Sequence, residues 1–450
     1  MDVIGKIKNL IQGQSRSAMV KKNIIASFGI KGVSILVSFA LVPMTIGYVS
    51  SELYGVWLTL SSILTWLCFL DIGFSQGLKN KLAEAIALGD WTRGKSLVST
   101  TYFMMLLIFI PVCLLLEAII PLIDWCYLLN VNFQYQNEIK QTMGVLIAFA
   151  CLQMIVNVLV SVIAAFQKVA LSNSFSVIGN MISLVIISVL TKVCPPSLLA
   201  LAFSLAAMPI LVTIIASIIL YSGKFKSVAP SVRSINCSYI RDLFGLGYKF
   251  FIINIQVVVL YQSTNVLISY VSSPEEVATY NIAYKLLNIA MMTFVIISGP
   301  LWPAYTDAYA RGDFEWMKNM RKKMKLVLFY TVLGCFSIAL LSTPIYKFWI
   351  GGKIEIPFTM TLIVAVYVSV YCWMKLNTTL LVGIGKIHVE TITVVIGMLI
   401  HVPLSLFLSK FFSAYGVITS MILVNLLYAI VFGFQVRMIL NKKAKGLWNK

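Results

Sequence analysis

Charged side chains are scarce in this sequence. They make up 11% of its 450 residues, whereas a soluble domain usually carries about 25%. Hydrophobic residues account for 60% of the chain, and the mean hydropathy is +0.92. Apolar runs of about 20 residues recur, and each is long enough to cross a bilayer core of about 30 Å. The composition excludes an ordinary soluble protein and predicts an all-α polytopic membrane protein.

Acidic residues and histidines are scarcer than basic residues. The chain holds 16 Asp and Glu and 2 His. A membrane enzyme of glycan assembly would need clustered intramembrane acids, a metal site or a sizeable external domain, and a nucleotide-driven pump would need a Walker A loop. None of these patterns is found in the sequence. We therefore expect no enzyme, no bound metal and no cofactor.

Cysteine pairs with metal-ligand spacing are also missing. Most of the eight cysteines lie within or beside apolar runs, which favours buried free thiols over a disulfide framework. The first 23 residues are polar and basic, without a short apolar core before a cleavage site. We therefore expect no cleaved signal peptide.

Long hydrophobic segments are abundant in this sequence, and their number predicts the fold. Twelve spans are expected, at 24–49, 54–76, 97–120, 142–166, 171–192, 197–222, 242–271, 279–305, 326–349, 357–382, 387–409 and 413–438. The external segments are short, the longest being the stretch around 121–141. This pattern excludes a large external catalytic domain.

Lysine and arginine are distributed unequally between the two sets of loops. With the N-terminus inside, the cytoplasmic loops and tails hold 26 of them and the opposite loops five. The positive-inside rule then predicts that both termini lie in the cytoplasm. The net charge of +19 thus lies in short loops that leave no room for a folded basic domain. We expect anionic membrane lipid as a partner and no nucleic acid.

The chain repeats itself once. Residues 83–91 match 306–314, Ile46-Gly-Tyr-Val-Ser-Ser51 matches Ile268-Ser-Tyr-Val-Ser-Ser273, and Lys168 with Val177-Ile-Gly179 matches Lys386 with Val395-Ile-Gly397. The offsets of 223, 222 and 218 residues agree on one period. Two six-helix lobes related by a pseudo-twofold axis along the membrane normal, with a central cleft, are therefore predicted. The expected domains are a cytoplasmic segment 1–23, an N-lobe 24–222, an inter-lobe loop 223–241, a C-lobe 242–438 and a basic tail 439–450.

Four lysines fall inside the predicted spans: Lys31, Lys249, Lys285 and Lys375. A lysine facing lipid at a helix centre costs about 2.5–3.5 kcal/mol, although one near a helix end can extend its ammonium group to the interface. Each of these lysines shares a helix face with other polar residues, which indicates a side turned away from lipid. The pattern predicts a positively charged cavity for an anionic passenger such as a phosphate or diphosphate.

Other polar residues within the spans complete the candidate site. Sugar contacts are expected from Tyr367, Tyr371, Trp373, Gln256 and Asn288, although aromatic residues at helical spacing more often serve packing. Proton coupling is a further hypothesis, with Asp71, Glu390 or His401 as the titrating group. An unperturbed histidine titrates closest to neutral pH.

Several motifs resemble those of O-antigen and capsule flippases, in the polysaccharide branch of the MATE-like exporter superfamily. In the first half they are Tyr54-Gly-Val-Trp57 and the stretch from Leu70-Asp-Ile-Gly-Phe-Ser to Leu82-Ala-Glu-Ala85. In the second half they are Gly299-Pro-Leu-Trp-Pro-Ala-Tyr-Thr-Asp-Ala308 and Gly383-Ile-Gly-Lys386. The resemblance spans nearly the whole chain.

The resemblance implies two six-helix lobes and a substrate of undecaprenyl diphosphate carrying one oligosaccharide repeat unit. That substrate would be flipped from the cytoplasmic to the periplasmic leaflet by alternating access. A polysaccharide polymerase and a chain-length regulator are the implied protein partners. Two alternatives stay open: a multidrug or metabolite antiporter on the same fold, and a non-transporting scaffold of a glycan-assembly complex.

Overall fold

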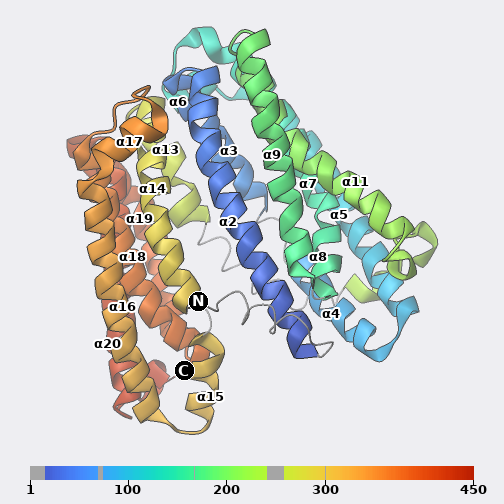
Figure 1. Ribbon diagram of the computed structural model, residues 1–450, viewed down its shortest axis with the longest axis vertical. Coiled ribbons are helices and arrows are strands. Elements are labelled where there is room, and N and C mark those ends of the chain that lie inside the picture. Colours follow the sequence, from blue (N-terminus) through green and yellow to red (C-terminus); the bar gives the residue numbers. More distant parts are fainter. Residues whose placement is uncertain (1–15, 69–73, 167, 241–257, 299–300, 450) are drawn as a thin grey trace, which may run out of the picture. The chain divides into compact units, whose positions relative to one another are not determined.

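The computed structural model describes residues 16–68, 74–166, 168–240, 258–298 and 301–449. Every regular element within these ranges is a helix (Figure 1). Ten helical segments are long and apolar enough to cross a membrane. The predicted all-α polytopic fold is therefore confirmed. The other two predicted spans, 54–76 and 242–271, include residues outside the described ranges.

The contacts divide the chain into two compact units. Unit 1 comprises Met1–Ser50, Ile63–Cys126 and Asn132–Ile255. In it α9 packs on α2 and α11, and α5 packs on α4 and α7. Its helices are α2 (Arg16–Tyr48), α4 (Phe74–Leu88), α5 (Trp91–Ile119), η2 (Ile120–Leu122), η3 (Phe133–Tyr135), α7 (Gln136–Val156), α8 (Val158–Ala165), α9 (Val169–Val193), α10 (Leu198–Ala202), the π-helical turn η4 (Phe203–Ala207), α11 (Met208–Ser222), η5 (Lys226–Val228), η6 (Val232–Ser234) and η7 (Cys237–Tyr239).

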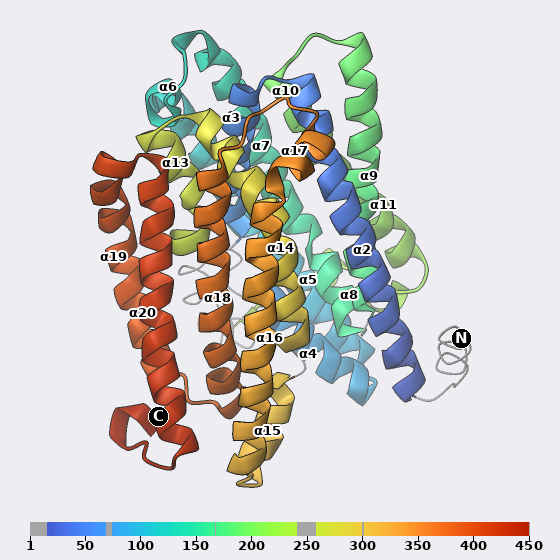
Figure 2. The same cartoon turned by 60° about the vertical axis from the view of Figure 1, so that its left-hand side comes forward.

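Unit 2 comprises Ser51–Ser62, Tyr127–Val131 and Gln256–Lys450. Its centre is α18, which packs against α14, α15, α16 and α20 (Figure 2). Its helices are the first part of α3 (Ser51–Cys68), the end of α6 (Trp125–Leu129), the π-helical turn η8 (Val258–Gln262), α13 (Thr264–Val271), α14 (Pro274–Ser298), α15 (Leu301–Ala310), α16 (Phe314–Leu340), α17 (Ser342–Ile350), α18 (Phe358–Ile384), α19 (His388–Phe412), α20 (Ala414–Leu440) and η9 (Gly446–Asn449).

Two short segments from the first half of the sequence belong to unit 2. The Asn265 side chain donates a hydrogen bond to the carbonyl of Leu58 at 3.3 Å. The buried Ser269 hydroxyl donates to the carbonyl of Leu129 at 2.8 Å. The predicted lobes are continuous stretches of the sequence. The two compact units exchange short segments instead, because packing depends on which helix surfaces fit together. The boundaries stay a prediction.

The sequence repeat has a matching local geometry. Gly89 and Gly312 both have φ of +71°, and the following aspartates begin α5 and α16. The Asp90 carboxylate accepts the backbone N–H of Arg93 at 2.9 Å, and the Asp313 carboxylate accepts that of Trp316 at 2.9 Å. A glycine in the left-handed conformation followed by an acidic N-cap is a compact way to join two helices. The two copies therefore fold into the same turn.

Helix α16 begins well before the predicted span. The run of apolar residues indicated a start at 326, whereas the helix starts at Phe314, directly after the Asp313 cap. Lysine, arginine and methionine between these points are good helix formers, so the helix extends beyond its apolar part. The segment 326–349 is also divided, because α16 ends at Leu340 and α17 begins at Ser342.

Candidate transport site

Lys285 lies in the middle of α14. At 1.5 Å per residue its Cα is about 16 Å along the helix from Pro274 and about 20 Å from Ser298. The side chain is half-buried, with Leu286 and Leu287 buried beside it. The predicted span began at 279 and put this lysine near one end. The observed helix starts five residues earlier and ends seven residues earlier than the predicted span, so Lys285 lies at its centre, away from both helix ends.

A row of tyrosines lies in the same unit as Lys285. Tyr284 stacks on Tyr280 with ring centroids 5.9 Å apart, and it contacts the ring of Tyr367 at 6.3 Å. Tyr367 contacts Tyr371 at 6.3 Å, and Tyr371 meets Tyr261 edge-on at 5.9 Å. The row links α14, α18 and η8 through five aromatic rings.

Tyr367 and Tyr371 are predicted sugar contacts, whereas the other three tyrosines of the row were not predicted from the sequence. Tyr280 and Tyr284 are spaced i, i+4 on α14, as Tyr367 and Tyr371 are on α18. This shared spacing is a signal that could have found the pair. Tyr367 and Tyr280 are buried, whereas Tyr371 and Tyr284 are partly exposed. The exposed members of the row could therefore contact a ligand, while the buried members position them.

Asparagines join the helices around this row. The Asn281 side chain donates to Asn265 Oδ1 at 2.8 Å, and the Tyr261 hydroxyl donates to Asn425 Oδ1 at 3.2 Å. These bonds link α13 with α14, and η8 with α20. Asn288, a predicted sugar contact, is half-buried, and its Oδ1 has no hydrogen-bond partner among the described residues. This free acceptor is one helical turn from Lys285.

Lys375 has an acidic neighbour. Its ammonium group interacts electrostatically with the carboxylate of Glu390, which lies in the first turn of α19 and also interacts with the Thr378 hydroxyl. Glu390 Oε2 is buried without a hydrogen-bond partner among the described residues. The interaction with Lys375 brings together a predicted phosphate ligand and a predicted proton acceptor.

The other predicted site residues have different surroundings. Lys31 on α2 is exposed. The candidate membrane span within α2 begins at Gly29, so Lys31 lies in the first turn of that span. Trp373 on α18 is partly exposed, at 39%. Lys249, Gln256 and Asp71 lie outside the described residues. Their roles, like that of Lys31, stay predictions.

His401 is a buried residue of α19 that packs against α20. Its Nδ1 lies 3.0 Å from the Ser420 hydroxyl and 3.4 Å from the Ser405 hydroxyl. The Ser420 hydroxyl also lies 3.1 Å from the His401 carbonyl, to which it can donate. The Nε2 atom is buried and without a partner within the described ranges. These contacts link α19 to α20, so His401 has a structural role that does not require proton transfer.

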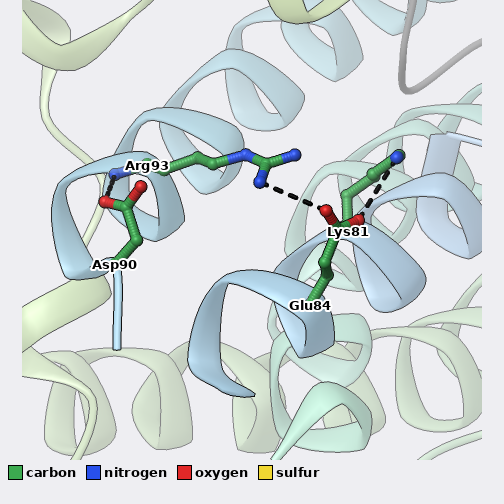
Figure 3. Close-up of polar contacts among 4 residues, drawn as sticks. All are labelled: Lys81, Glu84, Asp90 and Arg93. Carbon is green, nitrogen blue, oxygen red and sulfur yellow. Dashed lines mark hydrogen bonds and ion pairs between the residues drawn. The ribbon is translucent and has the colours of Figure 1, made fainter. Parts of the chain in front are cut away.

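Lys81 and Glu84, near the end of the first matched motif, form a charged cluster with Arg93 at the start of α5 (Figure 3). The Glu84 carboxylate on α4 receives Lys81 Nζ at 3.3 Å and Arg93 Nη1, from α5, at 3.3 Å. The hydrogen bond and charge of Lys81, with the charge of Arg93, hold the pKa of Glu84 below its usual value. The cluster ties α4 to α5 directly beside the repeated turn. No group of three or more His, Cys, Asp or Glu in the described part of the chain could hold a metal ion.

The helices of this polytopic protein have the arrangement of the MATE-like fold. One solved structure of this fold is the inward-facing conformation of a multidrug resistance MATE family transporter of the MOP superfamily, with a TM-score of 0.76 and 12% identity. The match covers 93% of this chain and 98% of that one. Another is the lipid II flippase MurJ in an inward closed conformation, with a TM-score of 0.71, 14% identity and coverage of 92% and 87%.

The sequence relationship is more specific than the fold. The family model described as "Polysaccharide biosynthesis protein" matches residues 20–309, and the chain belongs to this family. A relative from Yersinia pseudotuberculosis, described as "Putative O-antigen export protein", is 22% identical over 367 residues. That alignment covers 80% of this chain and 83% of the relative.

Proposed function

We propose that this protein is a flippase for undecaprenyl-diphosphate-linked oligosaccharide repeat units of the O-antigen or capsule type. It would act in a bacterial inner membrane with both termini in the cytoplasm, and move its substrate to the periplasmic leaflet by alternating access. Membership of the polysaccharide biosynthesis family and similarity to an export protein support the substrate class. A polysaccharide polymerase and a chain-length regulator would be its protein partners.

The observation that carries this proposal is the position of Lys285 at the centre of a membrane-spanning helix. A lysine there costs about 2.5–3.5 kcal/mol if it faces lipid, so it is retained where it has a polar surrounding or a function. A diphosphate is a strong partner for an ammonium group. The partly exposed rings of Tyr284 and Tyr371 offer flat surfaces of the kind that sugar rings pack against. No covalent change is needed for this transfer.

The electrostatic interaction between Lys375 and Glu390 supports a route for proton coupling. A diphosphate that reached Lys375 would compete with the Glu390 carboxylate for the same ammonium group. Glu390, once displaced, would favour taking up a proton, because a carboxylate buried without a partner is costly. This assigns the coupling role to Glu390 before His401 or Asp71. Lys31 and Lys249 remain further candidate ligands of the diphosphate.

The first test is deletion of the gene, which should trap repeat units on their carrier lipid at the cytoplasmic face. The second is the export of repeat units by Lys285→Ala and Lys375→Ala, each of which should lose a factor of about 10 to 100. A charge-assisted hydrogen bond contributes about 1.5–3 kcal/mol, which corresponds to that range. Lys323→Ala, an exposed lysine on α16, is the control. Full export by both intramembrane variants, at normal protein levels, would refute the proposed site.

The similarity to a multidrug MATE transporter favours an antiporter as the second candidate. A cationic drug calls for acidic groups in the binding site, whereas Lys285 and Lys375 are basic. Drug sensitivity of the deletion strain with unchanged surface polysaccharide would favour this alternative. A non-transporting scaffold predicts that neither lysine variant changes export while the protein is present.

A further inference from the structure

Basic side chains surround a pocket between the start of α16 and the end of α20. Figure 2 shows these two helices in unit 2. The pocket has a volume of about 200 Å³. It is lined by Lys318, Arg321, Lys322, Lys325, Arg437, Leu440 and Asn441. Five of these seven residues are basic and none is acidic, so the charged side chains that line the pocket are all positive.

The spacing of these residues is costly for the helix by itself. Lys318, Arg321, Lys322 and Lys325 follow i, i+3, i+4 and i+7 positions and therefore share one face of α16. Like charges at i, i+4 destabilise a helix, and this face holds two such pairs. Lys318 is compensated by Glu315, whose carboxylate lies 2.9 Å from its Nζ and lines the neighbouring pocket with Asp313. The remaining cations point to an anion as their partner.

Arg321 is held in place at the inner side of this pocket. Its Nη2 donates to Asn377 Oδ1 at 2.9 Å and to the Gly433 carbonyl at 3.5 Å, on α18 and α20 respectively. Asn377 is completely buried and donates in turn to the carbonyl of Trp373 at 3.1 Å. The Arg321 Nε atom is buried without a partner among the described residues. A guanidinium fixed in this way offers a preorganised contact for an oxyanion.

Apolar surface begins directly beside the basic residues. On α16, Leu326, Phe329 and Leu333 are each more than half exposed, and on α20 so are Ile430 and Phe434. Leu326 and Leu333 follow Lys322 on one helix face, and Ile430 and Phe434 share a face with Arg437. The Trp448 ring contacts Phe434 at 5.3 Å, and tryptophan is typical of the headgroup level of a bilayer. A ligand here would meet cations at one end and hydrocarbon at the other.

We infer that this pocket binds the phosphate group of an anionic phospholipid in the leaflet that faces the basic loops. The adjoining apolar faces of α16 and α20 hold the acyl chains, which a soluble phosphate lacks. Arg321, Lys322, Lys325 and Arg437 contact the phosphate oxygens. The site lies within unit 2 and does not depend on the proposed transport function.

The test measures lipid retained by the purified full-length protein, by native mass spectrometry after incubation with phosphatidylglycerol, cardiolipin or phosphatidylcholine. The anionic lipids should be retained preferentially. The triple variant K322Q/K325Q/R437Q should weaken their binding by roughly fivefold for each charge removed, because a basic residue at an anionic surface contributes a free energy of that order. These three residues are exposed and form none of the interhelical bonds of Arg321, so the variant should fold.

The matched control is K323Q/K443Q/K445Q, which removes the same net charge from exposed lysines outside the pocket. It should retain anionic lipid as the unaltered protein does. Equal losses in the two triple variants, or equal retention of zwitterionic and anionic lipid, would overturn the inference. Inorganic phosphate that displaces the lipid at millimolar concentration would assign the pocket to a soluble anion and overturn it as well.

Discussion

Single residues decide whether the charges inside unit 2 are tolerated. Lys375 has Glu390 as an acidic neighbour on the next helix of the chain, and Arg321 has Asn377 and a backbone carbonyl. Each contact offsets part of the cost of removing a charge from water. Lys285, at the centre of α14, is the residue from which the transport proposal starts.

Gly55 on α3 lies close to the backbone of Pro274 at the start of α14, and one substitution can test this close approach. A Cβ atom at this position would lie 1.7 Å from the carbonyl oxygen of Pro274, which is backbone and cannot rotate away. Gly55→Ala should therefore lower the free energy of unfolding by at least about 1–3 kcal/mol. Thermal unfolding in detergent measures this loss.

Gly334→Ala on α16 is the control for that experiment, since no atom lies within 4 Å of its added Cβ. Alanine is a better helix former than glycine by about 1 kcal/mol, so this variant should be neutral or slightly stabilised. Equal thermal stability of the two variants would contradict the close approach of α3 to Pro274.

Lys168, in the short connection between α8 and α9, should react with amine reagents at unusually low pH. Burial and the neighbouring Lys224 lower the pKa of its ammonium group to about 8. At pH 8 about half of the amine is then unprotonated, so acylation should be about tenfold or more faster than at an ordinary lysine of pKa about 10.4. Peptide mapping after brief labelling gives the rates.

Lys224→Gln should raise the pKa of Lys168 and slow its labelling at pH 8, because one of the two causes of the shift is removed. Exposed Lys323 serves as the internal reference in both proteins. A labelling rate at Lys168 equal to that of Lys323 would contradict the lowered pKa.

At the scale of elements, the repeated turn explains where α5 and α16 begin. Both helices start after a glycine with φ of +71° and an aspartate whose carboxylate accepts a backbone N–H three residues on. The shared geometry follows from local residues and needs no contact with distant parts of the chain.

Removal of either cap should have the same effect. Asp90→Ala and Asp313→Ala should each lower the free energy of unfolding by about 1 kcal/mol, because a backbone N–H loses its acceptor. Asp90→Asn and Asp313→Asn keep a side-chain oxygen and should be close to the unaltered protein. A loss as large in the asparagine variants would assign the effect to charge and not to capping. Denaturation in detergent compares the four proteins.

At the scale of the whole molecule, the proposed orientation in the membrane rests on loop charge alone. Cys194 and Cys237 are exposed free thiols. The positive-inside rule predicts that Cys194 lies in the periplasm and Cys237 in the cytoplasm.

The two cysteines are therefore natural reporters of topology. A membrane-impermeant thiol reagent should label Cys194 in intact spheroplasts and Cys237 only after permeabilisation. The variants Cys194→Ser and Cys237→Ser identify each signal. Labelling of Cys237 in intact spheroplasts would reverse the proposed orientation.

The sequence by itself determined the all-α architecture and most of the spans. Ten predicted spans correspond to long apolar helical segments, with ends that differ most where a capped helix continues beyond the apolar run, as at Phe314. Each span can be recognised alone, since a bilayer requires every segment to satisfy its own backbone hydrogen bonds. The match of residues 83–91 with 306–314 was also visible in the sequence, and the structure shows that both copies form the same turn.

Only the tertiary structure decided which side chains meet. Tyr261, Tyr284 and Tyr371 come from three separate helical elements, and Glu390 on α19 interacts electrostatically with Lys375 on α18. Residues 51–62 and 127–131 join unit 2 although they belong to the first half of the sequence. Such contacts depend on the rotation of each helix about its axis and on which helices pack together. Hydropathy sets neither quantity, because it averages over all faces of a helix.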